Sequence, residues 1–60
     1  MSTAYRFYVI GSENRILGNE LAMFENDAEA IRRGQELLVV TSGAKAVETW
    51  ERARLVDRSE

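Results

Sequence analysis

Few side chains in this sequence could take part in chemistry. The sequence contains no histidine and no cysteine, so the usual general base near neutral pH and the usual strong nucleophile are both missing. Carboxylates, serines, Lys45, Tyr5 and Tyr8 remain. A paired-carboxylate mechanism needs two acids that converge in a cleft, and so short a chain has little room for one. We therefore predict that the protein is not an enzyme and holds no cofactor and no metal, since structural zinc sites draw on cysteine and histidine.

Two short glycine-serine pairs could suggest a phosphate-binding loop. These pairs are Gly11-Ser12 and Ser42-Gly43. Neither belongs to a G-x-x-x-x-G-K signature, in which successive backbone N–H groups surround a phosphate. Both pairs are therefore predicted to be turns.

Several arginines could contact a nucleic acid, with Tyr8 or Trp50 as stacking groups. They are Arg32, Arg33, Arg52, Arg54 and Arg58. Each has Glu or Asp close by in the sequence, and the formal net charge of the chain is −2. This mixture favours a solvated surface, so no nucleic-acid partner is expected, and a weak nucleic-acid binder is kept as the alternative function.

Length and composition indicate one small globular domain over residues 1–60. The 60 residues are 45% hydrophobic, include no proline and mix charges of both signs. A core of this size gives little stability, and without disulfides or zinc the common remaining device is oligomerisation. No apolar run is long enough to span a bilayer and no signal peptide is evident, which predicts a cytoplasmic protein without a membrane partner.

One amphipathic helix is predicted from Asn26 to Gly43. Asn26 is a good N-cap, and Glu29 stands three residues later, as in a capping box. Ala30, Ile31, Gly34, Leu37 and Leu38 share one face. Gly34 lies in the middle of this apolar stripe, which predicts that an aromatic ring from a sheet packs against it.

A hairpin is predicted before this helix. The segment 4–10 is rich in aromatic and β-branched residues, with Tyr5, Phe7 and Val9 on one face and Tyr8 and Ile10 on the other. The turn residues 11–14 follow, and a second strand begins near position 15. Its apolar residues do not keep one alternating phase, so a bulge is expected at residues 18–19.

The segment from Ala44 to Asp57 fits two structures. Its alanines, glutamates and arginines favour a helix, whereas Val47, Trp50 and Val56 favour two short strands with a turn at residues 51–52. In the hairpin, Trp50 is expected to cover the helix face around Gly34.

A resemblance favours the hairpin. The sequence is similar to short uncharacterised bacterial proteins that begin with Tyr-Arg-x-Tyr, continue with a D-x-E-A helix and end with V-E-x-W-x-G-x-R-x-V. The matching residues are Tyr5, Arg6, Tyr8, Val9, Ile10, Asp27, Glu29, Ala30, Val47, Glu48, Trp50, Arg54 and Val56. Arg52 departs from the pattern, which has the glycine of a turn at that position. The resemblance implies the order ββαββ and transfers no activity.

The predicted fold is α+β, a small antiparallel sheet with one helix on one face in the order ββαββ, with ββαα as the second choice. The predicted function is a non-catalytic protein-interaction module that self-associates, with an unidentified protein partner as a further possibility. The predicted partner or oligomer surface consists of Tyr8, Ile10, Trp50 and Arg54. A weak nucleic-acid binder and a small oligomeric enzyme without a recognisable signature are the two alternatives.

Overall fold

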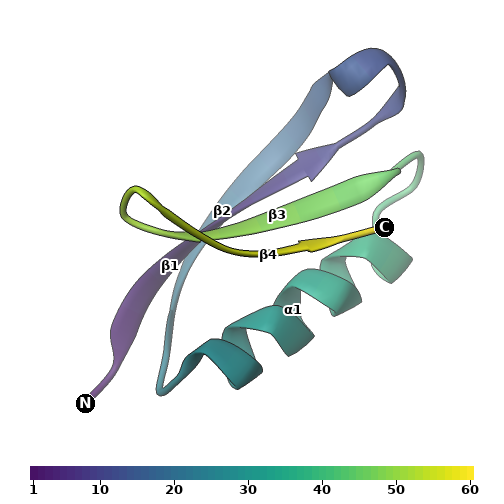
Figure 1. Cartoon of the computed structure of the whole chain (residues 1–60). Coiled ribbons are helices and arrows are strands. Elements are labelled where there is room, and N and C mark those ends of the chain that lie inside the picture. Colours follow the sequence, from purple (N-terminus) through teal and green to yellow (C-terminus); the bar gives the residue numbers. More distant parts are fainter.

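The computed structural model describes residues 1–60 and contains four strands and one α-helix (Figure 1). The elements are β1 (Thr3–Ile10), a 3₁₀ turn (Ser12–Asn14), β2 (Ile16–Phe24), α1 (Asp27–Val40), β3 (Ala46–Glu51) and β4 (Arg54–Ser59). The predicted order ββαββ is confirmed, and the segment after the helix forms a hairpin instead of a second helix.

The four strands form one antiparallel sheet in the order β2-β1-β3-β4. In the pairing of the two central strands, Phe7 lies opposite Thr49 and Val9 opposite Val47, whereas Tyr8 lies opposite Glu48. Because side chains alternate along a strand, the first two pairs share the face that packs on α1, and the third lies on the other face. The helix covers only one face of the sheet (Figure 1).

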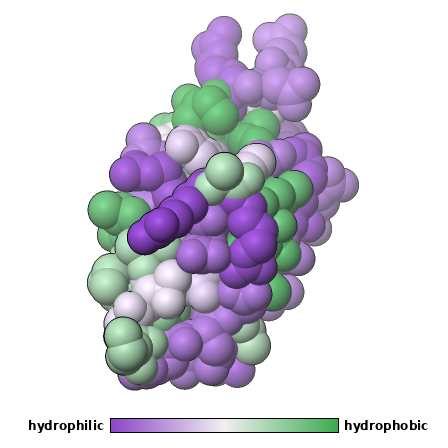
Figure 2. Space-filling view, turned by 60° about the vertical axis from the view of Figure 1, so that its left-hand side comes forward, coloured by the Kyte–Doolittle hydropathy of each residue, from purple (hydrophilic) through white to green (hydrophobic).

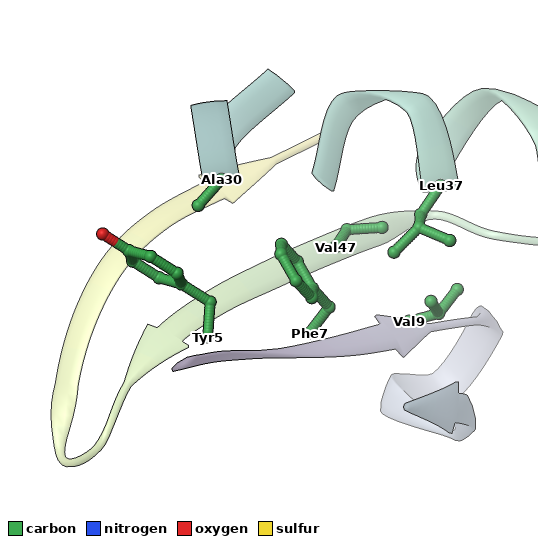
Figure 3. Packing of buried hydrophobic residues seen from close by; sticks show 6 residues of the cluster. All are labelled: Tyr5, Phe7, Val9, Ala30, Leu37 and Val47. Atoms are coloured by element: carbon green, nitrogen blue, oxygen red, sulfur yellow. The ribbon is translucent and has the colours of Figure 1, made fainter. Parts of the chain in front are cut away.

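The core lies between α1 and the sheet. Its six clustered residues are Tyr5, Phe7, Val9, Ala30, Leu37 and Val47. Figure 3 shows the three β1 side chains pointing toward the helix, with Ala30 and Leu37 pointing back toward the sheet. The ring of Phe24, at the end of β2, closes the cluster near the helix N-terminus, with its centroid 6.3 Å from Tyr5 and 6.0 Å from Phe7.

The helix begins and ends for local reasons. The Asn26 side chain accepts a hydrogen bond from the Glu29 backbone N–H at 3.0 Å, which confirms the predicted cap. The Glu29 carboxylate accepts from the Glu25 backbone N–H at 3.3 Å. At the other end α1 stops at Val40, before the predicted Gly43, which has a φ of 84° in the turn that follows.

The bulge in the first hairpin lies close to its predicted position. Val9 pairs with Gly18 and Ile10 with Ile16, so Leu17 is the extra residue on β2. The predicted site, residues 18–19, begins one residue later. The insertion allows the more regular part of β2 to place Ala22 and Phe24 toward the core.

The second hairpin turns one residue later than predicted. Glu51 pairs with Arg54, so Arg52 and Ala53 form the turn. Arg52 has a φ of 55°, the left-handed conformation that glycine adopts most easily. Arg52, whose backbone is less free than that of glycine, thus occupies the turn position where the similar proteins have glycine.

The side chain nearest to Gly34 is Thr49; the predicted aromatic ring also lies there, but it is that of Phe7, and the prediction for Trp50 is wrong. A side-chain carbon built on Gly34 would lie 2.7 Å from Thr49 Oγ1 and 3.8 Å from the Phe7 ring. Trp50, the next residue on β3, pairs with Arg6 on the face away from the helix. The helix approaches the sheet closely at Gly34, and the side chains of Thr49, Val47 and Phe7 occupy the space there.

Candidate functional site

The face of the sheet opposite the helix carries a shallow hollow of about 590 Å³. We call this surface the open face. Eight residues line the hollow: Ala4, Arg6, Tyr8, Ile16, Leu21, Glu48, Trp50 and Arg52. They come from β1, β2, β3 and the turn after β3, so strand pairing alone places them side by side.

Large apolar side chains on and beside the open face reach solvent. Leu21 and Met23 of β2 are each 59% exposed, Ile16 is 54% exposed, and Leu55 of β4 is 47% exposed. The view in Figure 2 shows hydrophobic groups at the surface between hydrophilic ones. Tyr8 and Trp50 are half-buried among their neighbours. A contiguous surface of this composition is typical of an interaction site.

Charged groups fix the orientation of the Trp50 ring. The indole Nε1 donates to the Glu48 carboxylate at 3.2 Å, and the Arg58 guanidinium donates to the same carboxylate at 2.6 Å. Arg58 also donates to Glu60 at 2.8 Å, and the hydrogen bonds to Glu60 and Glu48 raise the pKa of Arg58. Trp50 is therefore held in one position on the open face before any partner arrives.

Two arginines of the hollow form no ion pair. Arg6 donates only to the side-chain oxygen of Asn19, at 3.1 Å, and Arg52 lies in the turn after β3. The seven ion pairs of the chain include neither of them. The open face thus offers two guanidinium groups that can pair with an acid of a partner.

The four residues predicted as a partner surface do not all lie together. Tyr8 and Trp50 line the hollow of the open face. Ile10 lies on the same side of the sheet but is only 7% exposed, so it offers a partner almost no area. Arg54 turns to the helix side, where both terminal guanidinium nitrogens contact the Asp27 carboxylate at 3.1 Å.

Arg54 belongs to a network that the sequence did not indicate. The Tyr5 hydroxyl donates to Asp27 at 2.7 Å, and Arg54 also donates to Glu51 at 3.0 and 3.1 Å. The Arg54 hydrogen bonds, followed by that of Tyr5, lower the pKa of Asp27, and the hydrogen bond to Asp27 raises the pKa of Tyr5. The network joins β1, the first turn of α1 and β4, and its carboxylate is a weaker base than an ordinary aspartate.

A second network joins the helix to β2. Arg33 donates two hydrogen bonds of 2.8 Å to the Glu20 carboxylate and a further one to Glu36. The Arg33 hydrogen bonds lower the pKa of Glu20. A general base near neutral pH needs a carboxylate whose pKa is raised, so Glu20 and Asp27 are shifted in the wrong direction for that role. The hydrogen bonds of these two carboxylates join separate elements of the fold, which is a structural role.

Metal ligands and membrane spans complete the search for a site. The structure contains no group of three or more acidic, histidine or cysteine side chains that could hold a metal ion. No helix has the length and apolarity needed to cross a membrane. No family model, curated protein or solved structure matches this chain. The open face is therefore the candidate functional site.

Proposed function

We propose that this protein is a non-catalytic interaction module that self-associates by packing its open face against the open face of a second copy. The observation that carries this proposal is the placement of Tyr8 and Trp50 beside exposed Leu21 and Ile16 on a sheet face that the helix leaves uncovered. Covering that face would give the short chain a second apolar core.

The size of the surface suits a dimer. The chain measures 35 Å and 21 Å along its two longer axes, so the outline of its broad side is about 700 Å². Specific interfaces bury about 800 Å² on each partner. The whole face comes close to that size, so a stable contact between two copies would need all of it.

The composition of the face also suits protein contact. Aromatic residues, methionine and arginine are enriched in interfaces, whereas lysine and aspartate are depleted. Tyr8, Trp50 and Arg6 line the hollow of the open face, which has no lysine or aspartate and has Glu48 as its one acid. In a two-fold arrangement, the unpaired arginines of one copy can approach the Glu48 carboxylate of the other, so the same surface is complementary to itself.

Light scattering on a sizing column, combined with one substitution on the face, tests the proposal. The wild type should elute as a dimer or larger at tens of micromolar. Trp50→Ala removes the central aromatic group and should weaken association by about ten-fold or more, since such anchors carry much of the binding energy. Val39→Lys is the matched control, because Val39 is an 83% exposed apolar residue on the helix, far from the open face. Unchanged association of Trp50→Ala would contradict the proposal.

One observation favours a second function, the binding of single-stranded nucleic acid. Arg6 and Arg52 form no ion pair and lie in the same hollow as Tyr8 and Trp50, which offers cations and stacking rings on one face. The chain as a whole carries a net charge of −2, which opposes this function. Titration of labelled oligonucleotides at about 150 mM salt decides it: we expect weak binding, and sub-micromolar binding that declines steeply with salt would favour the nucleic-acid function.

A further inference from the structure

The two edge strands of the sheet differ in how they face solvent. The sheet order leaves β2 and β4 each with one side unpaired. An unpaired strand side presents free N–H and C=O groups to any other strand, and proteins usually protect such edges with charges, prolines or bulges. The protection is present on β4 and sparse on β2.

β4 is a protected edge. Three of its six residues are charged, Arg54, Asp57 and Arg58. Its pairing with β3 is also irregular, because the register shifts between Thr49 and Trp50 and leaves Val56 without a partner. A strand that is short, charged and bulged makes a poor template for another strand.

β2 is longer and carries far less protection. It has nine residues, of which Glu20 is the only charged one, and Glu20 is already paired with Arg33 on the helix side. Half of the eight large hydrophobic residues exposed in the whole chain lie on this strand: Ile16, Leu17, Leu21 and Met23. The bulge at Leu17 leaves residues 18–24 in regular register with β1.

We infer that the β2 edge binds the β2 edge of a second copy in antiparallel register, which joins two four-stranded sheets into one of eight strands. An antiparallel strand pair has a two-fold axis, so a strand can add to itself without a second kind of surface. With the axis at Leu21, the exposed Leu21 side chains of the two copies face each other.

The same register avoids repulsion between like charges. It places Glu20 opposite Ala22 of the second copy and Met23 opposite Asn19, so no carboxylate faces a carboxylate. A strand that paired with the other edge of the sheet would lie beside the charged residues of β4. A second copy therefore suits the β2 edge, because its own β2 strand brings no carboxylate opposite Glu20.

This contact goes beyond the proposed function because it uses the backbone edge of β2, whereas the proposed function uses the side chains of the open face; Leu21 borders both. Packing of open faces alone gives a dimer, and β2 pairing alone also gives a dimer. Where the two axes meet at right angles, the two contacts together give a tetramer with three mutually perpendicular two-fold axes, a common symmetry for oligomers. The two contacts can be removed separately, since Met23 does not line the hollow and Trp50 is not on β2.

Amide hydrogen exchange measured by NMR on the full chain tests the β2 contact. The alternate β2 amides that do not bond to β1 should exchange about ten-fold or more slowly than the outward amides of β4, and dilution should remove this protection. Met23→Lys adds the charge that protected edges carry and should restore fast exchange on β2. Leu55→Lys makes the same change at an exposed leucine of β4 and should leave β2 protected.

The results separate this inference from the proposed function. Trp50→Ala should lower the mass of the assembly and leave the β2 amides protected, whereas Met23→Lys should remove that protection and leave an association that Trp50→Ala still weakens. Equal exchange rates on the outward sides of β2 and β4 in the wild type would overturn the inference. Protection of β2 that survives both dilution and Met23→Lys would also overturn it, because the protection would then arise within one chain.

Discussion

Replacing Gly34 by alanine tests the packing of the helix on the sheet. An alanine in a helix interior is usually better than glycine by about 1 kcal/mol, so local propensity alone predicts a more stable protein. The structure predicts the opposite. The new methyl carbon would lie 2.7 Å from Thr49 Oγ1 and 3.6 Å from Val47 Cγ1, and both of these side chains are fully buried.

The size of the expected change in the free energy of unfolding follows from these two opposing effects. Overpacking a filled core costs about 1–3 kcal/mol, which exceeds the gain in helix propensity. We expect Gly34→Ala to lower the free energy of unfolding by up to about 2 kcal/mol. Gly18→Ala is the matched control, because a side-chain carbon at Gly18 meets nothing within 4 Å, and this change should be neutral or slightly stabilising.

A double-mutant cycle assigns the effect to one contact. Thr49→Ala removes the hydroxyl that collides with the new methyl group, so Gly34→Ala in that background should stabilise the protein by about 1 kcal/mol. The assay is urea unfolding followed by Trp50 fluorescence at one fixed protein concentration. A more stable Gly34→Ala protein with Thr49 still present would refute the reasoning.

Three further predictions concern the turn, the pairing of Glu20 with Arg33 and the cap. Arg52→Gly should leave the free energy of unfolding unchanged or raise it by up to about 1 kcal/mol in the same urea assay, because Arg52 has a φ of 55°, which glycine adopts more easily. A clear decrease in the free energy of unfolding would contradict backbone strain at Arg52. The pKa of Glu20 is lowered by Arg33, so its stabilising effect is present above the unfolded pKa and is lost as pH falls through the folded value. Acid unfolding below about pH 4 should therefore be less steep in Glu20→Gln, and equal steepness would count against the pairing with Arg33. Asn26→Ala should cost about 1 kcal/mol and reduce helical circular dichroism, because the side chain caps the Glu29 N–H; no change would mean that the cap contributes nothing.

Local patterns in the sequence were enough to predict the helix and the first hairpin. The helix was predictable because Asn26 caps it and its apolar residues recur with helical spacing. The first hairpin was predictable because alternation along β1 and the turn residues after it are also local signals. The second hairpin needed the resemblance, since the residues between 44 and 57 fit a helix equally well.

The side of the sheet on which Trp50 lies could not be predicted in the same way. Both alternating sets on β3 contain a plausible core residue, and the larger one, Trp50, suggested the wrong face. The decision depends on how closely the helix approaches the sheet at Gly34, where Thr49, Val47 and Phe7 are the nearest side chains. The sequence contains no local signal for that distance.

The ion pairs between residues that are distant in the sequence also could not be predicted from the sequence. Arg54 and Asp27 are 27 residues apart, and they meet because the β3–β4 turn lies near the start of the helix. Arg54 was predicted to lie on a partner surface, and no local pattern links it to Asp27. The open face itself was partly predictable, since Tyr8 alternates with the core residues Phe7 and Val9 along β1.

Sedimentation equilibrium of the wild-type chain tests the central claim of self-association most directly. Over a range from about 1 to about 100 μM, the account predicts a mass that rises with concentration to that of a dimer or tetramer. A constant monomer mass across that range would contradict the proposed role of the open face.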